Sequence, residues 1–176
     1  MSSAFGERIL DGKVAVVTGG GSGINLAIAE RFAQHGASVG LIGRTQEKLD
    51  SAAKGIIHRG GKSKGYSADV RDYEKLAAAI GAARAEFGEI DILVCGAAGN
   101  FPAPALGMSA NGFKAVVDID LLGTFNTCRA AFEHLKRPGA SIVNISATQA
   151  FVAMAMQSHV CAAKAGVDMF VSTGSY

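Results

Sequence analysis

The stretch from Val14 to Ile24 contains the residues with the clearest chemical meaning. An apolar run, VAVV, breaks into the glycine-rich turn TGGGSGI, after which the sequence takes on helical periodicity. Glycines let the backbone approach a phosphate closely, and the free N–H groups and dipole of a helix N-terminus favour negative charge. The pattern therefore predicts a nucleotide-binding turn; the alternative is a tight turn that selects glycine for its conformation alone. The candidate binding residues are Gly19, Gly20, Gly21, Ser22, Gly23 and Ile24.

This turn needs a strand before it and a helix after it, and the same alternation continues along the chain. Short apolar runs predict buried parallel strands, and stretches of helical periodicity predict the helices between them. The expected strands are residues 14–17, 38–43, 90–95 and 140–146, with 62–67 as a weaker candidate. The expected helices are residues 23–35, 46–58, 73–87, 111–136 and 154–171. This order predicts an α/β fold with a doubly wound, mostly parallel sheet and helices on both faces.

Length and composition agree with a small α/β protein. The 176 residues predict a single domain covering 1–176, and a hydrophobic content of 49% is enough for a core. No apolar run is long enough to span a bilayer, and the first residues lack the apolar segment of a secretory signal, so we expect a soluble protein. The 17 basic and 15 acidic side chains are not clustered, which gives nucleic-acid binding no electrostatic support. No Cys/His spacing predicts a metal site.

Several segments together resemble the short-chain dehydrogenase/reductase family. The turn at 18–24 is similar to the family's phosphate turn, Asp69-Val70 to its adenine contact, and CGAAG at 95–99 to the turn after its fourth strand. DLLGTFN at 120–126 and a later helical lysine follow in the family's order. The resemblance covers nearly the whole chain and implies a Rossmann fold with three αβα layers that binds a nicotinamide dinucleotide. It adds these cofactor-binding candidates: Asp69, Val70, Ala97, Ala98, Gly99 and Lys164.

Within that family, the chain most resembles the peroxisomal type of 2,4-dienoyl-CoA reductase. The resemblance is carried by CGAAGNF at 95–101, VDIDLLGTFN at 117–126, and HVCAAK at 159–164 followed by AGVD. It implies that an acyl-CoA thioester is the substrate. A 2,4-dienoyl thioester would be reduced to a 3-enoyl thioester, with hydride going to the far end of the diene and a proton placed next to the carbonyl. The alternatives are another short-chain 3-oxoacyl or keto reductase or dehydrogenase, and a nucleotide-binding protein without turnover.

The end of the second expected strand bears on the choice of cofactor. An acidic side chain there would bind the ribose 2′-hydroxyl of NAD and repel the 2′-phosphate of NADP, and a cation does the reverse. The sequence supplies Gly43-Arg44-Thr45, with one guanidinium and no acid, which predicts NADP(H). Lys48, one helical turn further on, would add to the same positive field. The alternative is that Arg44 is only a solvated residue at the start of a helix.

The family's usual catalytic positions hold residues that cannot donate a proton. Most members place a Tyr four residues before the Lys and a Ser thirteen residues before that Tyr, and these positions are Val160 and Ala147. The peroxisomal dienoyl-CoA reductases also lack that tyrosine and rely on an Asp and a Lys, so the resemblance assigns catalysis to Asp120 and Lys164. Lys164 would bind the nicotinamide ribose and, with Asp120, hold a water that delivers a proton. The alternative is structural, with Asp120 satisfying backbone groups and Lys164 only anchoring the cofactor.

The resemblance also implies contacts to the substrate. Arg71 is similar to an arginine that meets the coenzyme A phosphates, for which a guanidinium fork is well suited. Phe101 is similar to an aromatic residue that lines the acyl region, and Ser109 and Asn111 are similar to polar substrate contacts. The alternatives are a loop charge for Arg71, a core position for Phe101 and a helix N-cap for Ser109.

The sequence departs from the family pattern in two places. Asn25 stands where the phosphate motif normally has its last glycine, and we expect it to push the helix outward or to shift the pyrophosphate. The chain ends at Tyr176, part-way along the helix that carries Lys164, whereas family members continue with two more strands and the helices that wall the substrate pocket. We therefore expect a fold truncated at its C-terminal side. A homo-oligomer, either a dimer or a tetramer, built through the helices that start near Asn111 and Met154 would cover the exposed sheet edge.

Two features bear on the cellular location. Cys95, Cys128 and Cys161 are widely spaced and odd in number, which fits a reducing compartment, and each is most simply a small buried hydrophobe. The last residues do not form a peroxisomal address of the Ser-Lys-Leu type. We therefore expect a cytoplasmic protein.

Overall fold

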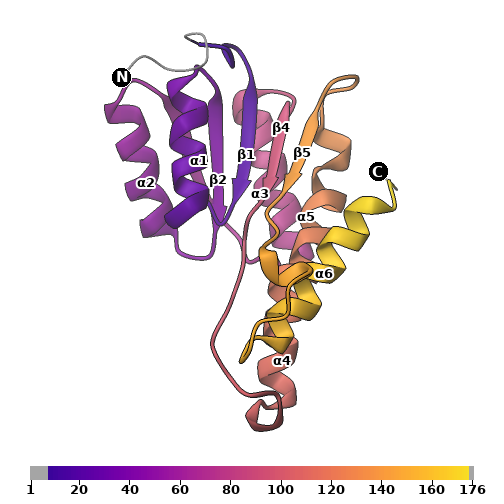
Figure 1. The fold of residues 1–176 in the computed structure, drawn as a ribbon. Helices are drawn as coiled ribbons and strands as arrows, with labels where there is room; N and C mark the ends of the chain where they lie inside the picture. Colours follow the sequence, from indigo (N-terminus) through magenta and orange to yellow (C-terminus); the bar gives the residue numbers. More distant parts are fainter. Residues whose placement is uncertain (1–7, 175–176) are drawn as a thin grey trace.

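The computed structural model describes residues 8–174, in which five parallel strands form one sheet (Figure 1). The strand order is β3-β2-β1-β4-β5, so the chain first builds the sheet in one direction from β1 and then returns to extend it in the other. The strands are β1 (Val14–Thr18), β2 (Ser38–Gly43), β3 (Lys62–Ser67), β4 (Ile92–Cys95) and β5 (Ser141–Asn144).

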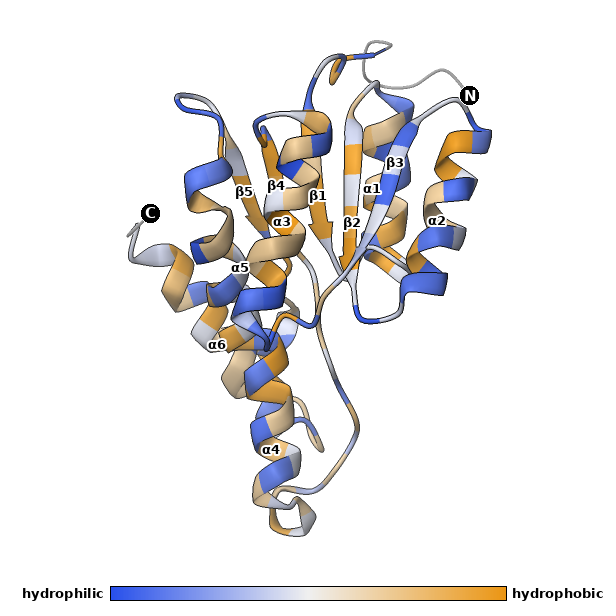
Figure 2. Ribbon diagram, turned by 180° about the vertical axis from the view of Figure 1, so that it is seen from behind, coloured by the Kyte–Doolittle hydropathy of each residue, from blue (hydrophilic) through white to orange (hydrophobic). Residues whose placement is uncertain are grey.

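Helices cover both faces of the sheet, as Figures 1 and 2 show. α1 and α2 pack on one face, and α3 and α5 pack on the other. α4 extends beyond the carboxyl ends of the strands, and α6 lies beside it and α5 (Figure 1). The helices are α1 (Gly23–Gln34), α2 (Gln46–His58), α3 (Tyr73–Phe87), α4 (Ala110–Val117), α5 (Gly123–Ala131) and α6 (Ser158–Ser172).

β1 shows why a strand at the centre of such a sheet is apolar throughout. Its side chains alternate between two hydrophobic cores because successive residues of a strand point to opposite faces. Val14 and Val16 pack into the core with α3 and α5, whereas Ala15 and Val17 pack into the core with α1 and α2. All four side chains are buried. The predicted doubly wound α/β fold with three layers is therefore confirmed.

The prediction of one continuous helix over 111–136 is wrong. The structure has α4, a π-helical segment at Asp118–Leu122, α5 and a 3-10 turn at Phe132–His134 in its place. A π-helical segment inserts extra backbone into a helix and changes the direction of the side chains around it, and such segments are frequent at functional sites. Asp120 lies at the centre of this segment. Periodicity alone could not show the interruption, because the apolar residues on both sides still follow a helical pattern.

Four other predicted elements are longer than the observed ones, and the helix over 23–35 exceeds α1 by His35 alone. β4 starts at Ile92, because Ile90 pairs separately with Leu135, and β5 occupies Ser141–Asn144. α6 starts at Ser158, after a loop in which Met156 has a φ of 64°. The backbone of Met156 accepts a hydrogen bond from the Ala103 amide, so a contact with a distant loop holds this segment out of the helix.

The cysteines behave as predicted at two positions. Cys95 and Cys128 are buried with their Sγ atoms 3.7 Å apart, and Cys161 is half-buried. Contact with Cys128 together with burial raises the pKa of the Cys95 thiol well above its ordinary value. No helix within residues 8–174 has both the length and the apolar character needed to cross a membrane.

A buried carboxylate locks the amino ends of the central strands together. Asp91 accepts hydrogen bonds from the Val14 amide at 3.0 Å and from the Lys13 ammonium at 2.9 Å. Burial alone would raise the pKa of Asp91, but the hydrogen bonds from Lys13 and Val14 outweigh it and hold that pKa below its ordinary value. The ionised carboxylate therefore stabilises the junction between β1 and β4.

We expect Asp91→Asn to lower the melting temperature at neutral pH, because it removes the charge that Lys13 and Val14 bind. The folded-state pKa is lower than the unfolded one, so the stabilisation is complete above the unfolded value of 3.8 and is lost as the pH falls through the folded value. The difference in melting temperature between the two proteins should be constant from about pH 5 to pH 7 and should shrink below about pH 4. Thermal denaturation followed by circular dichroism measures it, with the exposed substitution Glu47→Gln as control. A difference that does not change with acidity would contradict this role.

Candidate active site

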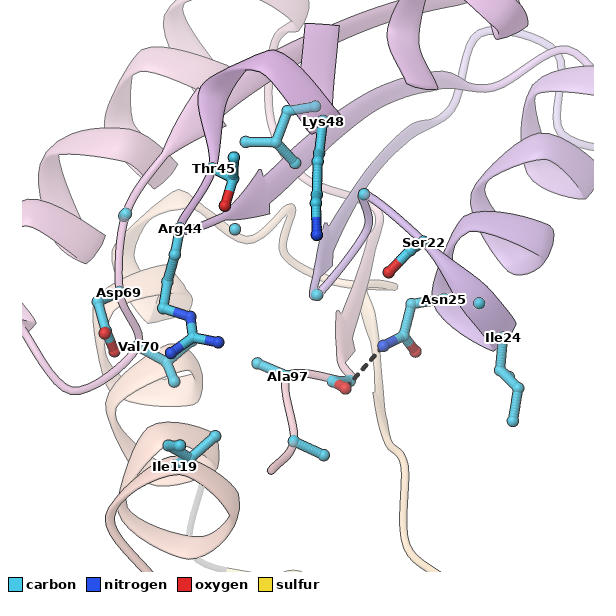
Figure 3. Close-up of a pocket in the computed structure, with 18 of the residues that line it drawn as sticks. Ser22, Ile24, Asn25, Arg44, Thr45, Lys48, Asp69, Val70, Ala97 and Ile119 are labelled. Carbon is cyan, nitrogen blue, oxygen red and sulfur yellow. Dashed lines mark hydrogen bonds between the residues drawn. The ribbon is translucent and has the colours of Figure 1, made fainter. Parts of the chain in front are cut away.

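The carboxyl ends of the central strands border a cavity of about 580 Å³ (Figure 3). It lies beside β1, between β2 and β4, where the strand order reverses, which is where open α/β sheets bind their ligands. Most of the predicted cofactor-binding residues line it: Gly19, Gly21, Ser22, Gly23, Ile24, Arg44, Asp69, Val70, Ala97 and Ala98. Gly20 does not line it, because its Cα position faces the Val17 carbonyl and Leu41. Gly99 and Lys164 lie outside the lining and contact Asp120 instead.

The N-terminus of α1 suits a phosphate group. Ser22 occupies the N-cap position, but its side chain makes no capping hydrogen bond, whereas Asp72 and Ser109 cap α3 and α4. The first amides of α1 therefore remain available to an anion next to the cavity. Gly19 has a φ of 71°, and a Cβ on it would approach the Ala97 backbone to 3.1 Å. These features fit the pyrophosphate of a dinucleotide.

The side chain of Asn25, on the first turn of α1, forms a hydrogen bond to the turn that follows β4. Its Nδ2 donates to the Gly96 carbonyl at 2.7 Å, and the two segments are so close that a Cβ on Gly96 would lie 2.1 Å from Asn25 Oδ1 (Figure 3). The expectation that Asn25 pushes α1 outward or shifts the pyrophosphate is not tested by this contact and stays a prediction. The polar side chain joins α1 to the turn after β4, a contact that a glycine could not make.

The charges around the cavity favour an anionic ligand. Arg44 and Lys48 both project into it (Figure 3), and neither forms a salt bridge within residues 8–174. The carboxylate of Asp69 is bound by the guanidinium of Arg71, with Nε at 3.0 Å and Nη2 at 2.6 Å. Hydrogen bonds from Arg71 hold the pKa of Asp69 below its ordinary value. The acidic group is thus already neutralised, and two cations remain for the ligand.

Asp120 and Lys164 form a buried ion pair. Their side chains are 1% and 7% exposed, and Lys164 Nζ lies 3.3 Å from Asp120 Oδ2. The other carboxylate oxygen of Asp120 accepts the Gly99 amide at 2.7 Å, and Lys164 Nζ also donates to the Ile145 carbonyl at 2.9 Å. Both charged groups therefore have fixed partners, as buried charges require.

This ion pair lies directly behind the wall of the cavity. Ile119 precedes Asp120 in the chain and lines the cavity, and so does Ile145, whose carbonyl binds Lys164. The sequence prediction that placed these two distant residues together agrees with this geometry. The family's usual tyrosine position is occupied by Val160, which is buried and apolar.

The predicted substrate residues lie near this site but make other contacts. Arg71 is engaged with Asp69, and Ser109 caps α4 by accepting the Gly112 amide at 3.0 Å. Asn111 is exposed on the first turn of α4. Phe101 is 39% exposed, and its ring packs against His159 with the centroids 4.7 Å apart. None of these four residues is among those that line the cavity.

The sequence analysis missed three contacts that shape the site. Thr18 Oγ1 at the end of β1 accepts the Gly96 amide at 3.1 Å and donates to the Val94 carbonyl at 3.3 Å. Asn126 on α5 donates to the Val70 carbonyl at 2.9 Å and so fixes the backbone of a cavity residue. A polar residue at the end of an apolar strand, and an asparagine within an apolar helix, were the available signals.

The fold and this site define a class of protein. The chain belongs to the short-chain dehydrogenase family, whose model, described as short chain dehydrogenase, matches residues 13–175. The members of this family are oxidoreductases that use nicotinamide dinucleotides. The predicted resemblance to the family is therefore confirmed.

Among individual proteins, the chain is similar to peroxisomal 2,4-dienoyl-CoA reductases. The protein of that name from Arabidopsis thaliana is 45% identical over 96% of this chain, and the one from Rattus norvegicus is 47% identical over 93%. The chain spans 59% and 57% of their lengths, less than two thirds in each case. A solved structure, a citronellol catabolism dehydrogenase from Pseudomonas aeruginosa, is 35% identical with a TM-score of 0.92, over 99% of this chain and 72% of that one.

These relatives correct the expected cellular location. The cytoplasmic location expected from the lack of a peroxisomal address is wrong. The similar proteins from Arabidopsis thaliana, Rattus norvegicus and Saccharomyces cerevisiae are all named as peroxisomal. An address is read at the end of a full-length protein, and this chain covers only part of the length of its relatives, so its last residues carry no information about location.

We expect Gly96→Ala to lower the free energy of unfolding by about 1–3 kcal/mol, because the new methyl group would overlap the amide of Asn25. In an Asn25→Gly background the same substitution should be less harmful, with a coupling of about 1 kcal/mol. Urea denaturation of the two single variants and the double variant measures this coupling. Gly55→Ala on α2 serves as control, since a Cβ there has space. Additive effects of the two substitutions would show that Asn25 and Gly96 do not interact.

Proposed function

We propose that the protein is an NADPH-dependent reductase of 2,4-dienoyl-CoA thioesters. The observation that carries the proposal is the buried pair of Asp120 and Lys164, which lies directly behind the wall of a cavity suited to a dinucleotide. Similarity to proteins named 2,4-dienoyl-CoA reductase supports it.

The cavity would hold the cofactor in an extended form. The glycine turn and the free amides of α1 would bind the pyrophosphate, and Asp69, Val70, Ala97 and Ala98 would surround the adenosine and the inner ribose. Arg44, with Lys48 beside it, would bind the 2′-phosphate that distinguishes NADPH from NADH. The bound cofactor supplies the hydride for the reaction.

Lys164 is placed for two tasks. An ammonium has three N–H donors, and the Ile145 carbonyl and the Asp120 carboxylate account for two of them. The third would bind the nicotinamide ribose or a water molecule. Asp120 orients the ammonium, so that a proton can pass from Lys164, directly or through that water, to the carbon next to the thioester carbonyl.

Arg71 retains the capacity to bind the coenzyme A phosphates. Its guanidinium uses Nε and Nη2 on Asp69, which leaves the donors of Nη1 for a phosphate. Phe101, Ser109 and Asn111 lie near α4, on the side where the acyl chain would enter.

We also propose that the protein acts in peroxisomes, as its named relatives do, and that it assembles as a homo-oligomer through the helices near Asn111 and Met154. Exposed apolar side chains on α5 and α6, such as Phe125 and Met169, support the assembly.

The direct test is to follow NADPH absorbance with hexa-2,4-dienoyl-CoA, beside a 3-oxoacyl-CoA as control. Loss of NADPH with the dienoyl thioester alone is the expected result. Loss with the 3-oxoacyl thioester instead would indicate a keto reductase. Binding of NADPH without turnover of either compound would indicate a nucleotide-binding protein.

We expect Asp120→Asn to reduce the turnover of the dienoyl thioester by about 100-fold or more, a typical contribution of a proton-transfer group. The affinity for NADPH should change much less, because Asp120 binds the Gly99 amide and Lys164, whereas Lys164 has an N–H donor left for the nicotinamide ribose. Lys164→Ala should lower both turnover and NADPH affinity. Steady-state kinetics and calorimetric titration separate these effects. Full turnover by Asp120→Asn would remove the proton-relay role.

We expect Arg44→Ala to weaken the binding of NADP⁺ by about 10–100-fold, the value of a charge-assisted hydrogen bond. Binding of NAD⁺ should hardly change, because it lacks the 2′-phosphate. Calorimetric titration with both nucleotides measures the ratio of affinities, and Lys54→Ala, on the exposed part of α2, is the matched control. Equal losses for the two nucleotides would show that Arg44 does not select NADPH.

A further inference from the structure

His159 is a fully buried polar side chain without a hydrogen-bond partner. It is 0% exposed, and neither Nδ1 nor Nε2 finds a partner among the described residues 8–174. In either charge state an imidazole carries at least one N–H donor, and leaving it unpaired in a protein interior is unfavourable. Buried polar groups in native structures are nearly always hydrogen-bonded, so we expect the imidazole to pair with a group other than the described residues.

The surroundings of His159 place it beside the Asp120–Lys164 pair. It lies on α6, five residues before Lys164, which is about 7.5 Å along the helix axis. Its ring packs on Phe101 at 4.7 Å, and Phe101 is two residues after Gly99, the residue whose amide binds Asp120. Two residues of chain span at most about 7 Å. Five residues also turn a helix by about 140°, so His159 and Lys164 lie on different sides of α6, and the segment from Gly99 to Phe101 is what connects the imidazole to the ion pair.

The segment from Gly99 to Phe101 joins these groups into one unit. Gly99 binds Asp120, the side chain of Asn100 approaches Gln157 at 3.4 Å, and Phe101 packs on His159. Each of three successive residues thus contacts either the π-helical segment or the start of α6. This arrangement fixes the imidazole relative to the two charged groups.

The proposed reaction needs a hydrogen-bond donor for the thioester oxygen, and none of the residues assigned so far has that role. When hydride adds to the far end of the diene, the π electrons move through the conjugated system and place negative charge on the thioester oxygen. They return to the carbon next to the carbonyl when that carbon takes a proton, and the oxygen must be stabilised in the interval. Asp120 accepts hydrogen bonds only, Lys164 is assigned to the proton, and Val160 and Ala147 carry no donor.

We propose that His159 donates a hydrogen bond to the thioester oxygen of the acyl-CoA substrate. This inference rests on the proposed function and adds a catalytic residue to it. Phe101 holds the imidazole ring through their contact and shields it from water, so that the N–H is oriented before the negative charge develops. The same hydrogen bond binds the ground-state carbonyl, more weakly.

The test compares two substitutions of His159 in the reaction with NADPH and hexa-2,4-dienoyl-CoA. His159→Phe keeps an aromatic ring and removes both nitrogens, and we expect kcat to fall by about 100-fold, as for the loss of an oxyanion donor. His159→Gln restores an N–H donor and should recover part of that loss. The affinity for NADP⁺ should be unchanged in both. His35→Phe is the matched control, since His35 is also buried but lies at the C-terminal end of α1.

A binding measurement keeps the inference testable without turnover. Histidine-selective ¹⁵N labelling gives four imidazoles, and the His159 signal is the one missing from His159→Phe. We expect this signal to shift when hexa-2,4-dienoyl-CoA is added to the protein with NADP⁺, and the thioester to bind at least about 10-fold more weakly to His159→Phe.

Four outcomes are distinct. Turnover by the wild type that falls in His159→Phe and partly returns in His159→Gln supports both the reductase function and the role of His159. Turnover that is unchanged in His159→Phe overturns the role of His159 and leaves the function standing. A shifted His159 signal without turnover supports the carbonyl contact while the reductase function fails. An unshifted signal, or no binding of the dienoyl thioester to the wild type, overturns the inference.

Discussion

The burial of one carboxylate and one ammonium behind the dinucleotide cavity is the constraint on which the site depends. Asp120 and Lys164 lose nearly all contact with water, and each gains fixed partners in return, the Gly99 amide and the Ile145 carbonyl. Removing one member of such a pair generally costs about 3–5 kcal/mol, because the other charge is left buried and unpaired. The π-helical turn, the segment after β4 and the end of β5 must therefore all be in place before the pair can form.

The same edge of the sheet supplies the rest of the site. Parallel strands end together, so the turns after β1, β2 and β4 meet around one cavity where the strand order reverses. Hydrogen bonds of Thr18 and Asn25 with Gly96 connect the end of β1 and the start of α1 to the turn after β4 and so fix the shape of the cavity. Charge is distributed unevenly around it, since Asp69 is neutralised by Arg71 while Arg44 and Lys48 have no ion-pair partner within residues 8–174. Hydrogen-bonded turns and two cations without ion-pair partners among the described residues are suited to a cofactor that carries several phosphates.

Sequence reasoning succeeded where a local pattern has one physical meaning. The bounds predicted for β2, β3, α2 and α3 match the structure, because apolar runs and helical periodicity there are bounded by turn-forming residues. It failed at the predicted helix over 111–136 and at the start of α6, where a π-helical segment and a contact between the 103 and 156 backbones replace regular structure. It also did not find the hydrogen bond from Asn25 to the Gly96 carbonyl, since the direction of a side chain relative to a distant turn is not encoded in its neighbours. Nothing in the sequence around His159 indicates that its side chain is buried without a hydrogen-bond partner among the described residues.

The sequence by itself determined the α/β alternation, the glycine turn at the start of α1, the cation at the end of β2 and the lack of a proton donor at positions 147 and 160. Each of these follows from residue type and short-range spacing. Only the tertiary structure decided that Asp120 and Lys164 lie 3.3 Å apart, that Arg71 binds Asp69, and that His159 is buried against Phe101. These facts join residues that are distant in the chain or depend on how a side chain turns. Packing of the whole molecule sets such distances and burial, and no local pattern contains them.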